Sequence, residues 1–347
     1  MSVIVGLLLA AFGGGLDASQ ALVMGLAKRW RWETIWLVWA VFGCLILPWA
    51  TAFLLLRDPS PVEVFRSVSS ESLAQVLLFG AGWGVGAILF GLGIVRVGMG
   101  LGLGISVSLT AANGAIWPLI QSKSEMLLSP EAAIIYLAVG LLVLGIVLCS
   151  LAAYQRAEHK PLLARETSSF AAGVLCCIGS GFASPMINLA FAEGIQINRV
   201  AEKLGASQLG AGMASVALIM TAGFVVNAIY CVYLLTRNRS WQDFAIPGVR
   251  SHWYCGIAMG VLQMAAFLIY SIAANRIDYS TNLGGAVLAW PVYTASVILV
   301  GNLEGLLRGE WKGSDRRTFV LLAGGLALLL AASSIVVGLG SYLTTAP

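Results

Sequence analysis

The sequence predicts an all-α polytopic membrane protein with ten transmembrane helices. Ten charge-poor, apolar stretches separated by short charged loops follow one another along the chain. A helix needs roughly 20 apolar residues to cross a hydrocarbon core of ~30 Å, and each stretch is about that long. Hydrophobic residues make up 59% of the 347 residues and charged residues only 10%, against ~25% charged residues in soluble domains. Helices are expected because backbone polar groups inside a bilayer must be satisfied internally.

The ten predicted spans cover Val3–Gly25, Thr34–Leu56, Ala74–Val95, Met99–Ile120, Ala132–Ala153, Ser169–Phe191, Leu209–Leu235, Trp253–Ala274, Gly284–Leu303 and Thr318–Gly340. The first is expected to be retained and not cleaved as a signal peptide, because no small-residue cleavage pattern follows it and its basic cluster comes after the apolar run. The longest polar stretch, 57–72, is expected to be a loop. The chain is thus one membrane domain, 1–347.

The number of spans suggests two halves, 1–155 and 168–347. Five spans per half is an odd number, so the second half would lie upside down relative to the first. Transporters commonly have such an inverted repeat, with the substrate site between the halves at the midplane.

The basic residues predict the orientation. Loops after the odd-numbered spans carry 14 of the 20 Lys and Arg residues, and basic residues accumulate in short cytoplasmic loops. Both termini are therefore expected outside. The net charge of +4 does not call for a nucleic-acid partner, and the lipid bilayer is the expected surrounding.

Cysteine and histidine do not indicate a metal site. The six cysteines lie in spans or at their ends without a CxxC pair, which is typical of small apolar packing residues. His159 and His252 lie in loops far apart in sequence. No metal, cofactor or catalytic residue is expected, and the spans hold no pair of a nucleophile and a base.

Glycines spaced by four are dense in the third and fourth spans. They form the pairs Gly80/Gly84, Gly82/Gly86, Gly98/Gly102 and Gly100/Gly104. Small residues at this spacing let two helix backbones approach closely. A nucleotide-binding loop is not favoured, because no strand precedes the glycine-rich run.

Asp17 is the carboxylate that lies well inside a predicted span. An aspartate at a helix centre is disfavoured by about 2.5–3.5 kcal/mol on insertion scales. Removal from water favours the neutral, protonated form of a carboxyl group, so Asp17 is the candidate for proton coupling. A structural role in hydrogen bonding between helices is the alternative.

Neutral polar and aromatic residues in the spans suggest a pocket for a polyol. Amides both donate and accept hydrogen bonds, as sugar hydroxyls do, and sugar rings stack on aromatic faces. Hydrogen bonding between helices is the alternative for each amide. Aromatic residues near span ends, such as Trp30, Trp32, Trp36 and Trp311, are expected in the interfacial belt. The substrate-binding candidates are Gln20, Trp83, Asn113, Trp117, Asn188, Asn227, Gln263, Trp290 and Tyr293.

Three motifs give the chain a family resemblance. The first is Lys28–Arg29–Trp30–Arg31–Trp32–Glu33–Thr34–Ile35–Trp36, followed by Ile46–Leu47–Pro48–Trp49–Ala50. The second is Phe79–Gly80–Ala81–Gly82–Trp83–Gly84–Val85–Gly86 with Arg96 and the run Met99 to Ile105. The third is Gly309–Glu310–Trp311–Lys312 with Arg316–Arg317. Over essentially its full length the chain resembles the L-rhamnose-proton symporter family, within the drug/metabolite transporter superfamily of ten-span carriers. Asn188, Asn227, Gln263 and Trp290 fall where members carry the same residue types.

The resemblance implies uptake of L-rhamnose or a related monosaccharide together with a proton, across a bacterial inner membrane. The chain departs from the pattern at Ala87 and Phe90, where enterobacterial members carry Asn and Tyr, and at Tyr293, where they carry His. Asp17 and Asn113 stand where those members have apolar or small residues. The resemblance therefore fixes neither the sugar nor the coupling residue. An exporter of the same superfamily and a non-transporting sugar sensor are the alternative functions, and monomer and homodimer stay open.

Overall fold

The computed structural model describes residues 3–97, 99–122, 124–158, 167–281, 283–309 and 311–345, and every regular element within them is a helix. His159 and Glu310 lie outside the described residues. The α-helices are α1 (Val3–Ala18), α2 (Gln20–Met24), α3 (Trp32–Trp39), α4 (Leu47–Leu55), α5 (Pro61–Ser67), α6 (Ser70–Val97), α7 (Met99–Ser122), α8 (Pro130–Glu158), α9 (Thr167–Ala183), α10 (Met186–Lys203), α11 (Gln208–Arg237), α12 (Arg250–Asp278), α13 (Gly285–Leu307) and α14 (Arg316–Thr345). A π-helical segment, η1 (Ala40–Ile46), joins α3 to α4, and short 3₁₀ turns form η2 (Ser124–Met126) and η3 (Trp241–Ala245).

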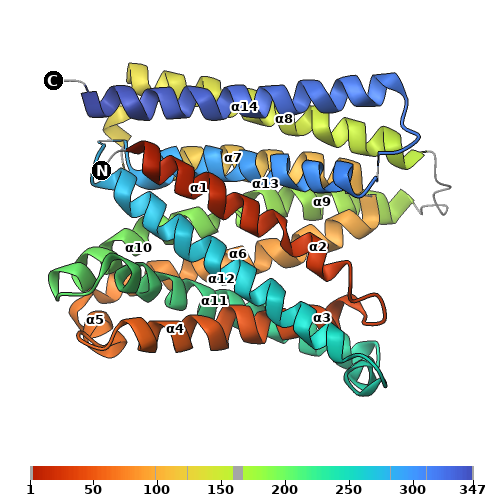
Figure 1. The fold of residues 1–347 in the computed structure, drawn as a ribbon, viewed down its shortest axis with the longest axis horizontal. Helices are drawn as coiled ribbons and strands as arrows, with labels where there is room; N and C mark the ends of the chain where they lie inside the picture. The colour runs from red at the N-terminus through yellow and green to blue at the C-terminus, as the bar shows by residue number, and fades with distance from the viewer. Residues whose placement is uncertain are drawn as a thin grey trace.

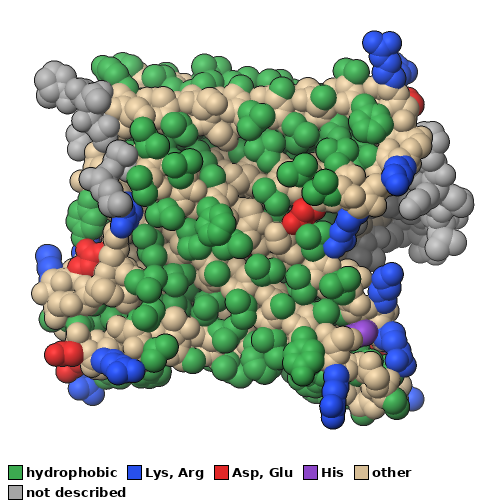
Figure 2. Space-filling view, viewed as in Figure 1, with side chains coloured by type: hydrophobic (Ala, Val, Ile, Leu, Met, Phe, Trp, Pro, Cys, Tyr) green, Lys and Arg blue, Asp and Glu red, His purple; other side chains and the backbone are tan. Residues whose placement is uncertain are grey.

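Nine helices or helix pairs in the described part of the chain are long and apolar enough to cross a membrane, and they coincide with nine of the ten predicted spans. The predicted fourth span corresponds to α7, a continuous helix of 24 residues. The long helices run side by side, with both termini at the same end of the bundle (Figure 1). Lys and Arg side chains gather at the two ends of the bundle, and the surface between them is mostly apolar, as Figure 2 shows. This distribution is that of a polytopic membrane protein.

Three predicted boundaries need correction. The sixth span does not end at Phe191, because after an interruption at residues 184–185 the chain continues as α10 to Lys203. The first span is not one helix, since α1 ends at Ala18 and α2 begins at Gln20. The stretch 57–72 is not only a loop: it contains α5, whose N-terminus is closed by a capping box between Ser60 and Glu63.

The glycine pairs of α6 pack against neighbouring helices as predicted. A Cβ on Gly80 would lie 2.8 Å from the Ile219 carbonyl oxygen, and one on Gly84 would lie 3.1 Å from the Gly223 carbonyl oxygen, both in α11. Gly82 and Gly86 face the break between α9 and α10 in the same way. Gly98 lies outside the described residues. The described pairs therefore bring α6 into backbone contact with two neighbours.

The helices form layers that follow one another down Figure 1. The helices α8 and α14 pack closely together along one side. Next come α1, α7, α9 and α13, then α6, α10 and α12, with α3, α4 and α11 on the far side. The largest apolar core extends from α1 and α13 across α12 to α3 and α11, and it includes the fully buried Trp39, Tyr270 and Met213. All six cysteines are free, five of them buried.

Candidate substrate and proton site

The first helix lies directly against the backbones of α12 and α13. A Cβ on Gly14 would come within 2.3 Å of the Tyr293 carbonyl oxygen, and a Cβ on Gly13 within 3.0 Å of the Ala266 carbonyl oxygen. Real Cβ atoms do not approach so closely, so glycine is required at Gly14 for this contact. The glycine run therefore allows Asp17, one turn later, to lie beside α12 and α13.

Asp17 is joined to two glutamines at the interruption between α1 and α2. The Gln20 Nε2 atom donates a hydrogen bond to the Asp17 carboxylate and another, of 2.9 Å, to the Gln263 Oε1 atom. Asp17 and Gln20 are half-buried and Gln263 is buried. Gln20 thus connects the carboxylate on α1 to the amide on α12. One residue before Gln20, the Ser19 hydroxyl donates to Glu304 Oε1 at 2.8 Å.

Two buried polar atoms face Asp17 without a hydrogen bond of their own. The Tyr293 hydroxyl and the Gln263 side chain interact with the carboxylate. Even so, the Tyr293 Oη and Gln263 Nε2 atoms have no partner within hydrogen-bonding geometry. An unsatisfied buried polar group costs about 1–3 kcal/mol. Such groups are therefore expected where a ligand or proton changes the hydrogen bonding.

Aromatic rings form one wall beside Tyr293. The Trp290 ring stacks on Tyr293 with centroids 5.8 Å apart and an interplanar angle of 16°, and Tyr270 meets Tyr293 edge-on at 5.0 Å. The Trp290 indole donates to the Thr110 carbonyl oxygen at 3.2 Å. The indole also packs against Gly114 of α7, where the Cβ of any other residue would lie 2.1 Å from the indole nitrogen. Trp290 thus fixes α13 closely against α7.

A second aromatic group surrounds Asn227. The Trp36 indole donates to Asn227 Oδ1 at 2.9 Å, and the amide nitrogen of Asn227 donates to the Gly223 carbonyl oxygen at 2.9 Å. Trp36 packs on Trp39, Trp39 on Trp83, and Trp83 on Phe267, with centroid distances of 4.4, 6.4 and 5.5 Å. Phe267 is one helical turn from Gln263 on α12, so these rings lead from Asn227 towards Asp17. The fully buried Trp39 leaves its indole nitrogen unpartnered.

The interfacial-belt prediction is wrong for three tryptophans. Trp36 is turned inward to Asn227. Trp30 is buried and donates to the Asp243 carbonyl oxygen at 2.8 Å. Trp311 is buried beneath the Arg156 guanidinium, which lies 4.6 Å from its ring centroid. Each side chain finds a partner in a distant segment that the local sequence does not reveal.

Asn188 is fully buried and all its hydrogen bonds are made within the protein. Its amide nitrogen donates to the Gly114 carbonyl oxygen at 2.6 Å and to the Ala286 carbonyl oxygen at 3.1 Å, and its oxygen accepts from the Tyr270 hydroxyl. Asn188 therefore ties α10 to α7, α12 and α13. In this conformation it offers a substrate no free group.

Asn113 and Trp117 lie on the side of α7 that faces α9. The Asn113 amide donates to the Gly181 carbonyl oxygen at 3.0 Å, and the Trp117 ring lies 6.1 Å from Phe182. No contact joins either side chain to the Asp17 group in the described part of the chain.

The structure brings together Asp17, Gln20, Gln263 and Tyr293, with Trp290 adjoining, while Trp83 and Asn227 belong to the neighbouring aromatic group. Sequence reasoning did not single out Trp39, Phe267 or Tyr270 as lining residues. A signal existed for Phe267 and Tyr270, because they follow Gln263 by four and seven residues and so share its helix face. Trp39 shows no comparable signal.

A bundle of apolar helices that holds the Asp17 carboxylate, several amides and stacked aromatic rings between its helices defines a polytopic membrane carrier for a small polar molecule. The chain belongs to the L-rhamnose-proton symport protein (RhaT) family, whose model matches residues 1–342. It is therefore a transporter and not an enzyme, and its family couples sugar movement to protons without a cofactor.

Curated relatives agree with this membership, and a solved structure shares the fold. The L-rhamnose-proton symporters of Yersinia pestis (strain Pestoides F) and Yersinia pseudotuberculosis (serotype O:1b, strain IP 31758) are each 28% identical over 346 residues, covering 98% of both chains. A solved crystal structure of a protein with 14% identity matches 95% of this chain and 96% of its own, with a TM-score of 0.56. That likeness shows the fold alone.

Proposed function

We propose that the protein takes up L-rhamnose or a closely related monosaccharide together with a proton, and that Asp17 carries the proton. The observation that carries this proposal is the Asp17 group. A carboxylate inside the bundle is hydrogen-bonded to Gln20, Gln20 is bonded to Gln263, and the unpartnered Tyr293 hydroxyl faces the same carboxylate. Membership of a proton symporter family calls for a group that carries a proton, and the position and hydrogen bonds of Asp17 make it our candidate.

The chemistry of the site suits a neutral sugar better than an organic cation. Gln263 and Gln20 present both donors and acceptors, and Trp83, Phe267 and Trp290 supply ring faces. A cation exporter would favour several buried carboxylates, whereas Asp17 is the carboxylate well inside a span. The departures from the enterobacterial pattern at Ala87, Phe90 and Tyr293 leave the choice among related monosaccharides to experiment.

In the proposed cycle, Asp17 binds a proton while the site faces outwards. The neutral carboxyl group can then donate a hydrogen bond to Gln263 or to a sugar hydroxyl. Sugar and proton are released together once the site faces inwards, where water re-solvates the charged carboxylate and favours loss of the proton. The membrane potential drives the positive charge inwards, so sugar is accumulated.

Alternating access fits an inverted repeat of two five-helix halves, 1–155 and 168–347, in which α7 is counted as the fourth of ten spans. The repeat would exchange spans one and six, two and seven, three and eight, four and nine, and five and ten. Helix packing supports this exchange: α1 packs on α12 and α13 as α9 packs on α6 and α7, and α8 packs on α14. Spans one and six would be equivalent in this repeat, and each is divided into two helices, α1 and α2 in span one and α9 and α10 in span six. This is the plan of the drug/metabolite transporter superfamily to which the sequence bears resemblance.

The proposed orientation places both termini outside the cytoplasmic membrane of a bacterium. The loops after the odd-numbered spans carry most of the basic residues and would lie inside. The end of the bundle that holds both termini in Figure 1 is then the outer end.

Uptake in proteoliposomes tests the proposed function. Radiolabelled L-rhamnose is added with and without an inward proton gradient, and L-fucose, L-lyxose and D-mannose serve as competitors. Accumulation above the external concentration only with the gradient is expected. Inserted, folded protein that moves none of these sugars would exclude the proposal and favour export of another metabolite or ligand sensing.

A further inference from the structure

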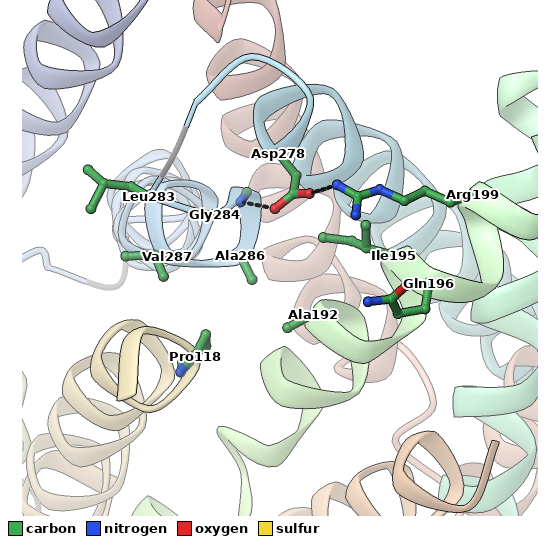
Figure 3. A pocket seen from close by; sticks show the side chains of 11 residues that line it. Pro118, Ala192, Ile195, Gln196, Arg199, Asp278, Leu283, Gly284, Ala286 and Val287 are labelled. Carbon is green, nitrogen blue, oxygen red and sulfur yellow. Dashed lines mark hydrogen bonds and ion pairs between the residues drawn. The ribbon is translucent and has the colours of Figure 1, made fainter. Parts of the chain in front are cut away.

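A cavity lies at the end of the bundle proposed to face outwards. We call it the outer pocket. It has a volume of about 190 Å³ and is enclosed by α7 at Pro118, by α10 from Ala192 to Arg199, by the end of α12 at Asp278 and by the start of α13. Figure 3 shows these residues on the four helices and the α12–α13 connection, with Arg199 reaching from α10 to Asp278. None of its residues belongs to the Asp17 group.

The polar groups of the outer pocket carry opposite charges that balance. Arg199 forms an ion pair with Asp278, and the Gly285 backbone N–H donates to the other Asp278 oxygen, Oδ1, at 3.2 Å. The Arg199 Nε atom is buried but has no hydrogen-bond partner. The exposed Gln196 amide adds a donor and an acceptor at the rim.

These groups match the hydroxyls of a neutral polyol. Carboxylate, guanidinium and amide groups are planar and can each bond two adjacent hydroxyls at once. An anion or a cation would compete with the Arg199–Asp278 pair, whereas a neutral molecule can bind both members. Pockets for drug-sized ligands have ~300–1,000 Å³, so a cavity of about 190 Å³ suits one monosaccharide and excludes larger glycans.

The floor of the outer pocket is the hydrogen-bonded group around Asn188. Ala286 lines the pocket, and its carbonyl oxygen accepts from the Asn188 amide. On the inner side, Tyr270 donates to Asn188 and packs against Tyr293. The buried, hydrogen-bonded residues Asn188 and Tyr270, which we call the Asn188 layer, thus lie between the outer pocket and the Asp17 group.

We infer that the outer pocket is a sugar-binding site that a monosaccharide occupies from outside before the Asn188 layer opens towards Asp17. This inference rests on the proposed direction of uptake and names a second site for the same substrate. The outer pocket selects by size and hydroxyl pattern, and the Asp17 group couples the sugar to the proton.

Protection of an engineered thiol tests the inference. In the Gln196→Cys variant, whole cells are treated with a membrane-impermeant thiol reagent, with and without L-rhamnose, against the wild-type background of six native cysteines. We expect labelling from outside that the sugar slows in a saturable manner. The Lys203→Cys variant is the matched control, because Lys203 is exposed and two helical turns further along α10. It should be labelled without protection.

Two further substitutions show whether protection is local. Added to Gln196→Cys, Asp278→Asn should raise the half-protecting sugar concentration roughly tenfold, as expected for one lost charge-assisted hydrogen bond. Tyr293→Phe and Asp17→Asn should leave it unchanged. The Lys203→Cys thiol, introduced beside Asp278→Asn, reports whether that variant is folded and inserted.

The outcomes separate this inference from the proposed function. Absence of outside labelling, absence of protection, or protection that depends on Tyr293 and not on Asp278 would overturn the outer sugar site even if the protein accumulates sugar. Local protection in a protein that accumulates no sugar would support the outer site and refute the proposed symport.

Discussion

Replacing Asp17 by Asn removes the proposed proton carrier with little change in shape. Asn has the same size, and its side-chain oxygen can still accept the hydrogen bond from Gln20 Nε2, so the helix packing is expected to survive. One unit charge crossing 100 mV is worth about 2.3 kcal/mol, which supports roughly 50-fold accumulation of a neutral sugar. With a single proton carrier, Asp17→Asn should lower accumulation from roughly 50-fold to none, while exchange of labelled sugar across the membrane continues.

The assay uses proteoliposomes with an imposed potential, negative inside, and measures net uptake and exchange in the same preparation. Glu304→Gln makes the same chemical change at the carboxylate that accepts from Ser19, and this control should still accumulate sugar. If Asp17→Asn still concentrates sugar, Asp17 is not the coupling group. Loss of exchange as well would mean that Asp17 is needed for binding or folding and not only for coupling.

Three smaller predictions follow from particular contacts. Gly14→Ala would place a Cβ 2.3 Å from the Tyr293 carbonyl oxygen, so thermal unfolding should show a loss of stability of about 1–3 kcal/mol. Gly140→Ala is the control, because a Cβ there would meet no atom within 4 Å, and its stability should match that of the wild type. If the two variants are equally stable, the close contact at Gly14 is refuted. Tyr293→Phe removes a hydroxyl without a hydrogen bond of its own, so the stability of the protein should be unchanged. The sugar concentration that half-saturates uptake should rise roughly tenfold. An unchanged half-saturating concentration would exclude the hydroxyl from the sugar site. Hydrogen bonds from the backbone N–H and hydroxyl of Ser60 lower the pKa of Glu63. Their stabilisation of α5 is therefore present at neutral pH and lost as the pH falls through the lowered pKa. Amide protection in α5, measured as the exchange rate relative to the intrinsic rate at the same pH, should fall in acid, and Glu63→Gln should lose this pH dependence.

The sequence allowed the spans and the central carboxylate to be predicted because both depend on local composition. The length of an apolar run reports a membrane crossing, and an isolated aspartate such as Asp17 is conspicuous within it. Gln20 and Gln263 could be named as polar, but their meeting through a hydrogen bond depends on how α1 packs on α12.

Other features depend on partners distant in sequence. Trp36 stands where belt residues are common, yet its indole finds Asn227 in α11. The sequence suggests Asn188 as a substrate-binding amide, but in the structure its amide nitrogen donates both of its hydrogen bonds to the backbone carbonyls of Gly114 and Ala286. The Arg199–Asp278 pair joins two ordinary-looking charges at helix ends. None of these pairings leaves a periodic pattern in the sequence.

The buried Asn188 layer also bears on how well the membrane is sealed. A proton crosses a membrane protein readily along an unbroken file of water molecules. Asn188 and Tyr270 are fully or almost fully buried, and Asn188 is bonded to backbone on two other helices, so we expect these two residues to interrupt such a file between Asp17 and the end of the bundle proposed to face outwards. If Asp17 carries the proton as proposed, the protein in this conformation would not dissipate the proton gradient of the cell by this route, and a proton would cross the layer only when the helices rearrange.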